Sequence, residues 1–385
     1  MLSSNINFKN FKIFSNKKNI RNDLKIFFSS KNELFKSFSR KYKNSYDIKK
    51  IKKITKNSKI RLIGIGGSIL GAKAIYDFLD KKVKKNFIFV DNFYKLKDKN
   101  KKKIVNIIIS KSGNTIETII NSNLLIKKRD RNIFVSEKKN SYLRELAQKL
   151  KAEIIDHNNF IGGRYSVLSE VGMLPAELMG LNVNKFRQLN NIIKNKNFID
   201  ILISNVGSII SLQKKKYFNS VIINYDSKSE NLFRWYQQLV AESLGKKNKG
   251  FMPIVSSMPQ DNHSLMQLYL DGLNKNFYTI FFSHEKNINK INENLLLPSH
   301  FYLNKKNINS ILYNQKTATE NIFIKKNIPF RSLEINKRDE KTLGELFIFF
   351  MLETILIGKF LNVNPYDQPS VELIKTESKR LFFQR

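Results

Sequence analysis

The chain has 385 residues, of which 41% are hydrophobic, including 30 Phe, so the length predicts two domains with sizeable cores. It contains no Cys, which excludes disulfides, thiol catalysis and Cys-ligated metal, and its four His lack metal-like spacing, so no metal site is expected. The net charge of +37 is compatible with a nucleic-acid partner, but Lys far outnumbers Arg and the charge is spread along the chain, so compositional drift is the simpler interpretation.

The first segment, residues 1–45, is predicted to be an arm of one or two short helices joined by polar loops. It is basic and rich in Ser, as transit peptides are, but the same bias continues along the whole chain. No apolar run precedes a small-residue cleavage site, and no uncharged run is long enough to span a membrane. We therefore expect a cytoplasmic protein with no membrane partner and no specific nucleic-acid partner.

From Lys59 onward, short apolar runs alternate with helical patterns, which is typical of parallel strands covered by helices on both faces. The expected strands of a first domain are 61–66, 86–91, 104–110, 131–136 and 152–156. A second, similar series has strands at 220–225, 278–282 and 329–335 and ends in two long helices. We predict an α/β protein of two doubly wound parallel sheets in three αβα layers, with domains at 46–185 and 186–385 after the arm at 1–45.

A glycine-rich turn follows the first strand in the sequence GIGGSILG, residues 64–71. Glycine there lets the backbone approach a ligand and leaves the amides of the next helix free. The dinucleotide fingerprint fails, because its third glycine would fall at Ile69. Close packing of the helix on the strand explains the same glycines equally well.

A hydroxyl-rich turn, SKSGNTIET at 110–118, follows the third strand and opens a helix. Four hydroxyls and Lys111 gather where free helix amides and the positive end of the dipole converge, which favours binding of a phosphomonoester. Ordinary N-capping is the alternative, but it needs only one hydroxyl.

The stretch from Trp235 to Gly272 contains one Glu and one His. Glu242 falls in the last turn of an amphipathic helix that Gly245 ends, and a carboxylate there suits a proton-abstracting base. His263 follows two helix-capping residues. A surface carboxylate and a solvated His are the alternatives.

Two further segments carry polar groups. The loop GGRYS at 162–166 presents Arg164, which can steady negative charge on oxygen or lie free on the surface. In the segment 364–375, Gln368, Glu372 and Lys375 are spaced to share one helix face, and Lys375 has an exposed ion pair with Glu372 as its alternative role.

Taken in order, these segments resemble the glucose-6-phosphate isomerase (phosphoglucose isomerase) family, whose fold is a pair of sugar-isomerase (SIS) domains. The similarity runs from about Arg61 to Lys379 in six blocks. They are GIGGSILG, SKSGNTIET, GGRYSVLSEVGMLPAEL, QQLVAESLGKKNKG, DNHS and NPYDQPSVELIK. The third, fourth and sixth blocks are specific to that family, whereas the first two are shared by other phosphosugar-binding SIS domains.

The resemblance implies an enzyme of glycolysis and gluconeogenesis that interconverts glucose 6-phosphate and fructose 6-phosphate without a cofactor or a metal. It implies that Glu242 carries the proton between C2 and C1 and that Arg164 stabilises the cis-enediolate. It further implies a homodimer in which His263, donated by the neighbouring subunit, and Lys375 help open the sugar ring. The residues implied in substrate binding are Gly67, Ser68, Ser110, Lys111, Ser112, Thr115, Thr118 and Gln368.

Three alternatives stay open at this point: a bifunctional glucose/mannose phosphate isomerase, a non-catalytic phosphosugar-binding regulator, and a basic nucleic-acid binder. The regulator would need the turn at 110–118 but not the four catalytic residues. The chain is also short for the family, and Asn114 stands where a Thr or Ser is usual, which bears on one phosphate contact.

Overall fold

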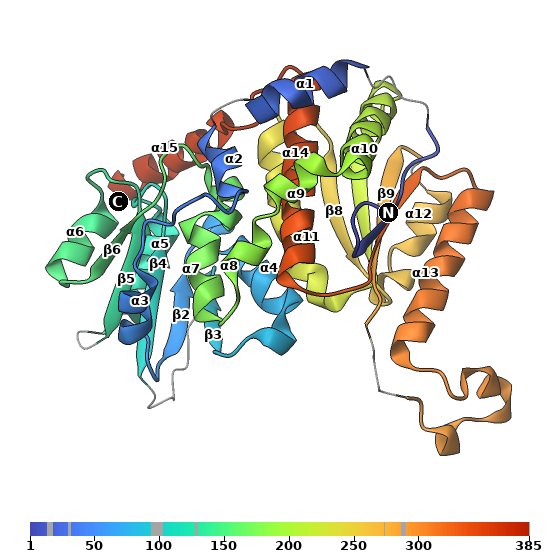
Figure 1. The fold of residues 1–385 in the computed structure, drawn as a ribbon, viewed down its shortest axis with the longest axis horizontal. Coiled ribbons are helices and arrows are strands. Elements are labelled where there is room, and N and C mark those ends of the chain that lie inside the picture. The colour runs from blue at the N-terminus through green and yellow to red at the C-terminus, as the bar shows by residue number, and fades with distance from the viewer. Residues whose placement is uncertain are drawn as a thin grey trace.

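The computed structural model describes residues 1–13, 18–29, 32–93, 103–127, 130–272, 274–285 and 290–384. Two five-stranded sheets lie side by side, each covered by helices (Figure 1). The predicted architecture of two doubly wound α/β units is confirmed. The position of the boundary between them, near residue 185, stays a prediction.

The first sheet is wholly parallel and has the order β3-β2-β4-β5-β6. Its strands are β2 (Lys59–Ile63), β3 (Phe87–Val90), β4 (Ile104–Ile109), β5 (Arg131–Ser136) and β6 (Glu153–Asp156). The chain starts in β2, adds β3 on one side and then β4 on the other. The order therefore reverses between β2 and β4, which is where open α/β sheets bind ligands, at the carboxyl ends of their strands.

The second sheet repeats this plan with the order β1-β10-β9-β7-β8. Its strands are β1 (Ile6–Lys9), β7 (Asn219–Asn224), β8 (Met252–Ser257), β9 (Asn276–Ser283) and β10 (Phe330–Ile335). Four strands are parallel, and only β1 runs antiparallel to its neighbour, β10.

The helices of the first half are α1 (Lys18–Ser29), α2 (Glu33–Ser37), α3 (Ile48–Ile54), α4 (Leu70–Phe78), α5 (Ile116–Leu125), α6 (Tyr142–Lys149), α7 (Glu170–Leu178), α8 (Val183–Phe186) and α9 (Leu189–Lys194). Those of the second half are α10 (Lys196–Lys214), α11 (Glu230–Leu244), α12 (Met266–Asp271), α13 (Ile308–Lys325), α14 (Glu340–Phe360) and α15 (Pro369–Phe383). The described 3-10 turns are η1 (Gly66–Ser68), η2 (Asp80–Lys82), η3 (Gly163–Leu168), η4 (Ser227–Ser229), η5 (Gln260–Asn262), η6 (Glu293–Leu295) and η7 (Pro298–Leu303).

Two strands were not predicted. The arm expected to be only helical begins with β1, in which Ile6 is fully buried while Asn7 and Phe8 are only partly so. β8 was missed between α11 and α12, because Pro253 interrupts its pattern. Its edge position explains why a proline is tolerated there.

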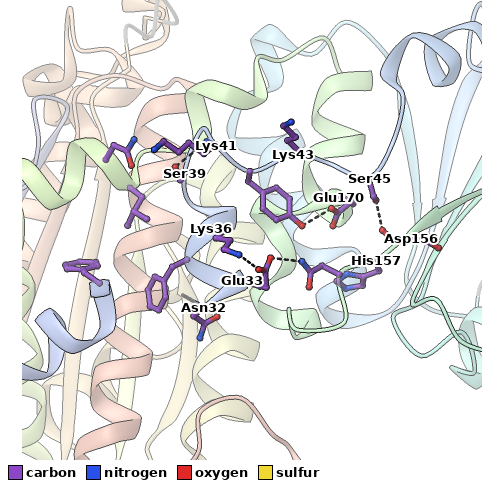
Figure 2. Close-up of a pocket in the computed structure, with 16 residues that line it drawn as sticks. Asn32, Glu33, Lys36, Ser39, Lys41, Lys43, Ser45, Asp156, His157 and Glu170 are labelled. Atoms are coloured by element: carbon purple, nitrogen blue, oxygen red, sulfur yellow. Dashed lines mark hydrogen bonds and ion pairs between the residues drawn. The ribbon is translucent and has the colours of Figure 1, made fainter. Parts of the chain in front are cut away.

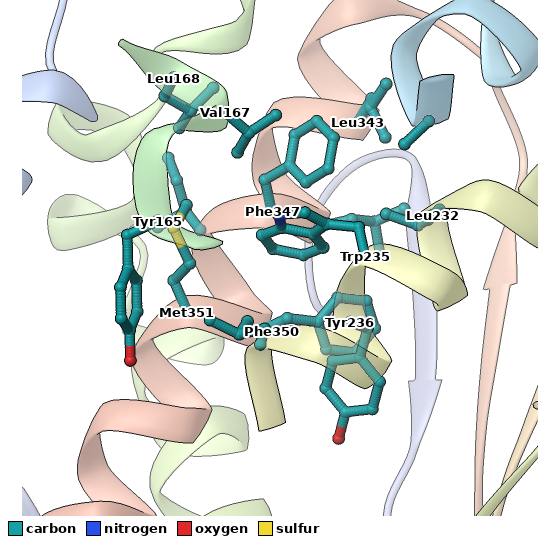
Figure 3. Close-up of a cluster of buried hydrophobic side chains, with 14 of the residues drawn as sticks. Tyr165, Val167, Leu168, Leu232, Trp235, Tyr236, Leu343, Phe347, Phe350 and Met351 are labelled. Carbon is teal, nitrogen blue, oxygen red and sulfur yellow. The ribbon is translucent and has the colours of Figure 1, made fainter. Parts of the chain in front are cut away.

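The core that joins the two sheets is built around α11 and α14, which lie in the middle of the molecule (Figure 1). Trp235 and Tyr236 of α11 pack with Phe347 and Phe350 of α14, at ring-centroid distances of 4.8 Å for Trp235–Phe347 and 4.5 Å for Tyr236–Phe350 (Figure 3). Tyr165 of η3 lies in the same cluster. The core therefore supports both the helix that carries Glu242 and the turn that carries Arg164.

In the part of the chain that the structure describes, no helix has the length and apolar character needed to cross a bilayer.

Candidate active site

The glycine-rich turn η1 lies directly after β2, at the point where the strand order reverses. A Cβ built on Gly67 would meet the backbone carbon of Gly163 at 2.3 Å and the nitrogen of Arg164 at 2.5 Å. Only glycine permits this approach, which brings η1 against the loop that carries Arg164. Of the two roles that the sequence left open for these glycines, Gly67 therefore serves close backbone packing. The neighbouring Ser68 is half-buried.

The hydroxyl-rich turn lies at the carboxyl end of the neighbouring strand β4, and Gly113 adopts the left-handed φ of +68° that the turn requires. The hydroxyls of Ser110 and Thr115 are 2.8 Å apart, and the Ser112 hydroxyl accepts a hydrogen bond from the amide of Asn114. Thr115 is the N-cap of α5, but its side chain forms no capping hydrogen bond. The first amides of α5 are therefore open to an anion.

Three other residues of this turn have partners or surroundings of their own. The Lys111 ammonium donates to the carbonyl of Asn159 at 2.9 Å and pairs with Glu137 at 3.2 Å. Thr118 is buried, and its hydroxyl has no partner among the described residues. Asn114 accepts a hydrogen bond from the amide of Tyr142, so its side chain ties the turn to α6.

Arg164 is 2% exposed, and its guanidinium joins three segments of the chain. It donates to Ser243 Oγ at 2.8 Å, to the carbonyls of Pro365 and Asp367 at 2.6 and 3.0 Å, and to Gln368 Oε1 at 2.5 Å. The interpretation of Arg164 as a surface arginine in a flexible turn is therefore wrong. Because these hydrogen bonds fix the guanidinium, its positive charge is already oriented before a substrate binds.

Glu242 accepts hydrogen bonds on both carboxylate oxygens. Arg164 Nη1 lies 3.2 Å from Oε2, and Gln238 Nε2 lies 2.8 Å from Oε1. The side chain is 30% exposed, so it is reachable from solvent while being fixed in direction. Gly245 caps the helix, as predicted. Glu242 also lines an open cavity of about 570 Å³ between α11 and α4, together with Lys73 and Asp91.

The structure thus brings Glu242, Arg164 and Gln368 together, and Gly67 supports them. Two other predicted site residues form no hydrogen bond or ion pair with this cluster among the described residues. His263 is exposed on the turn after η5, and its ring has no hydrogen bond or ion pair with the described residues. Lys375 is exposed on α15 and pairs with Glu372 at 2.6 Å.

Sequence reasoning missed Gln238 and Ser243, which hold the carboxylate and the guanidinium. The available signal was spacing: Gln238 lies one helical turn before Glu242 and therefore shares its face. The contact of Ser243 with Arg164 joins residues 79 positions apart, so no local pattern indicates it.

Sequence similarity to known proteins identifies the family of this chain. The sequence model described as Phosphoglucose isomerase matches residues 11–258. The chain is 31% identical over 370 residues to the glucose-6-phosphate isomerase of Methanocaldococcus jannaschii, covering 88% of each chain. It is 33% identical over 374 residues to that of Acholeplasma laidlawii, covering 87% of this chain and 85% of the relative.

Solved structures share the fold. A hypothetical protein from Thermus thermophilus superposes with a TM-score of 0.81 at 21% identity, covering 95% of this chain and 94% of the other. A glucose-6-phosphate isomerase from Chlamydia trachomatis superposes with a TM-score of 0.68 at 18% identity, covering 95% and 73%. At such identities these likenesses concern the fold alone, but the sequence matches go further: the chain belongs to the phosphoglucose isomerase family.

Proposed function

We propose that this protein interconverts glucose 6-phosphate and fructose 6-phosphate. The observation that carries the proposal is the contact between Glu242 and Arg164 at 3.2 Å, and it is supported by the N-terminus of α5, where Thr115 forms no side-chain capping hydrogen bond. Curated relatives that are 31%, 32% and 33% identical to this chain are named glucose-6-phosphate isomerase. A carboxylate and a guanidinium side by side are the two groups that an aldose–ketose isomerisation needs most.

Substrate binding begins at the phosphate. The hydroxyls of Ser110, Ser112 and Thr115 and the open amides of α5 donate to the phosphate oxygens, while Lys111 adds positive charge from the same turn. We assign Ser68 and Thr118 to the surroundings of the bound substrate and Gln368 to a contact with the sugar. Anchoring the phosphate orients the distant C1 and C2 atoms.

The chemical step uses Glu242 as a base. Its carboxylate takes the proton from C2 of the open-chain sugar, and the electron pair of the broken C–H bond forms the C1–C2 double bond of a cis-enediolate. Arg164 stabilises the negative charge on the enediolate oxygens. The hydroxyl proton of O2 passes to O1, so that the electron pair left on O2 can form the C2 carbonyl. The protonated carboxyl group then returns its proton to C1, which gives the ketose, and no redox or metal chemistry is needed.

Ring opening requires a proton donor and acceptor, which we assign to His263 and Lys375. Because His263 is exposed and is not among the partners of Glu242, we assign it to the site of a second copy in a homodimer. Exposed apolar side chains support such an interface: Leu373, Ile374, Phe382 and Phe383 of α15 are between 66% and 80% exposed. Absence of Cys fits a reducing compartment, and we assign the enzyme to the cytoplasm.

A coupled assay for conversion of fructose 6-phosphate tests the proposal. Glu242→Gln keeps the size of the side chain but removes the base, so kcat is expected to fall by about 10²-fold or more. Binding of a phosphorylated sugar-acid inhibitor should stay within a few-fold of wild type. Glu145→Gln, on the exposed face of α6, is the matched control and should leave both quantities unchanged. Equal loss of turnover and binding in Glu242→Gln would contradict the assigned role.

A further inference from the structure

A second cavity lies beside the same segment that carries Arg164. Its volume is about 680 Å³, within the range of small-molecule sites. Its walls come from α2 and the linker to α3, from the end of β6, from the first residue of α7 and from α9 (Figure 2). It shares no residue with the cluster of Glu242, Arg164 and Gln368 or with the turn at 110–118, so the proposed reaction does not account for it.

The deep polar group of this cavity is His157. The residue is 2% exposed, and neither ring nitrogen has a hydrogen-bond partner among the described residues. Burial, followed by the nearby Lys111, lowers the pKa of His157 to about 4, so the ring is neutral and offers one donor and one acceptor. A buried polar group without a partner is unfavourable, so the ring of His157 can gain hydrogen bonds from a ligand that enters the cavity.

The wall next to His157 is polar but carries little free negative charge. Tyr42 donates to Glu170 Oε1 at 2.8 Å, and burial raises the pKa of Glu170. The carboxylate of Glu33 is paired with Lys36 and accepts from Asn158. The third acidic residue of the lining, Asp156, pairs with Arg144 at 2.8 Å. An anion entering this cavity therefore meets no exposed carboxylate without a partner from these three residues.

The opposite side of the cavity is basic. Lys41 and Lys43 line it, are exposed, and have no carboxylate partner among the described residues (Figure 2). Phe35 and Leu189 supply an apolar wall on which the CH face of a sugar can pack. Positive charge, an apolar face and a neutral hydrogen-bonding ring thus surround one space.

We propose that this cavity is a second binding site, for a small hydroxylated anion of the phosphosugar or sugar-acid class. Lys41 and Lys43 hold the anionic group, and the imidazole of His157 pairs with a hydroxyl group. The shared chemistry is a polyol with one phosphate or carboxylate, and these two sources of charge are distinguished by the test below.

Binding here has a direct route to the active site. His157 lies a few residues before Arg164, and Glu170 a few residues after it, while the Lys111 ammonium donates to the carbonyl of Asn159 between them. A ligand that fixes the position of this segment therefore changes the position of Arg164 and of the turn at 110–118. This consequence rests on the proposed isomerase function, whereas the binding itself does not.

The test uses the full-length protein with ¹³C-labelled histidine, because four imidazole signals can be resolved and assigned by substitution. Ribose 5-phosphate, gluconate and inorganic phosphate are titrated separately. We expect ribose 5-phosphate, gluconate or both to move the His157 signal saturably while His284 and His300 stay in place, and the more effective probe identifies the preferred anionic group. The double variant Lys41→Ala/Lys43→Ala should raise Kd about tenfold and keep basal isomerase activity.

The matched control is Lys52→Ala/Lys53→Ala, which removes the same charge from exposed positions of α3 outside the cavity and should leave Kd unchanged. Three results overturn the proposal: no saturable shift of His157 up to about 10 mM of either organic probe, an affinity unaffected by loss of Lys41 and Lys43, or equal binding of inorganic phosphate, which means an adventitious ion only. None of them bears on Glu242→Gln, so failure here and failure of the isomerase proposal remain distinguishable.

Discussion

Arg164 shows how one side chain can organise a site made by distant segments. Its guanidinium is buried and donates to groups from α11 and from the segment before α15. A Lys at this position has one compact ammonium and cannot reach all these acceptors in the plane that Arg provides. The contacts that orient the charge for the proposed reaction therefore also fix the loop 162–168 against α11.

The close approach of Gly67 to this loop gives a direct test. Gly67→Ala puts a methyl group 2.3 Å from the backbone of Gly163, and backbone cannot move aside cheaply. The free energy of unfolding is expected to fall by about 1–3 kcal/mol, measured by urea denaturation, and catalytic activity should fall with it. Gly163→Ala is the control, because its added methyl group meets no atom within 4 Å and should cost little stability. Equal stability of the two variants would show that the contact is not restrictive.

The sequence predicts a site residue well when the partners of that residue are close to it in the chain. The turn at 110–118, Glu242 at the end of its helix and Gly245 as its cap all follow from short patterns, and their local structure is as expected. The burial of Arg164 does not follow, because its acceptors lie up to 204 positions away. Asn114 looked like a weakened phosphate contact, but its hydrogen bond to the amide of Tyr142 depends on the position of α6.

Among the elements, α14 carries a buried ion pair that joins it to β10. Arg331 and Glu353 are almost fully buried and paired, and Tyr236 donates to Glu353 at 3.0 Å. Glu353→Gln leaves the Arg331 charge buried without a counter-ion, so we expect a loss of about 3–5 kcal/mol in the free energy of unfolding. Asp200→Asn, which breaks the exposed pair with Arg21, should cost less than about 1 kcal/mol. Urea denaturation of both variants checks the difference, and similar losses would contradict it.

The N-cap of α14, Asp339, makes the stability of the fold depend on pH. Burial opposes the charge of Asp339, but hydrogen bonds from the amide and hydroxyl of Thr342 and the ammonium of Lys337 outweigh it and lower the pKa of Asp339. A carboxyl with a lowered pKa in the folded state adds stability above its unfolded pKa, and this is lost as pH falls through the folded pKa. Asp339→Asn should therefore cost about 0.5–1 kcal/mol at pH 7, where the charge favours the helix start.

Thermal unfolding across pH measures this effect. The gap in Tm between wild type and Asp339→Asn should shrink as pH falls below about 3.9, the usual pKa of Asp. Asp200→Asn serves again as the exposed control, with a small effect at every pH. A gap that persists unchanged in acid would mean that the charge of Asp339 is not its source.

The two strands that the sequence did not predict, β1 and β8, show why some whole elements cannot be found from local patterns. β1 has only four residues, and its partner β10 lies more than 320 positions further along the chain, so neither length nor local pattern reveals the pairing. β8 contains a proline and lies at the edge of the sheet. The parallel strands that were predicted are buried, and their apolar runs are nearly continuous, as in β4 and β9.

The whole molecule consists of two sheets of matching order, and the proposed site lies where they meet. η1 and the turn at 110–118 come from the first unit, Glu242 comes from the second, and the guanidinium of Arg164 bridges them. His263 follows β8, an edge strand of the second sheet, and forms no hydrogen bond or ion pair with this cluster among the described residues. A site built from two units of one chain thus leaves one proposed catalytic residue for a second copy to supply.

Subunit mixing tests this arrangement. Glu242→Gln and His263→Ala are each expected to be inactive as pure proteins. If each site takes Glu242 from one subunit and His263 from the other, a mixed dimer has one site with both substitutions and one wild-type site. Refolding an equal mixture gives about half mixed dimers, so activity should recover to about a quarter of the wild-type value. If His263 serves its own chain, every site of the mixture carries one substitution, and no activity returns.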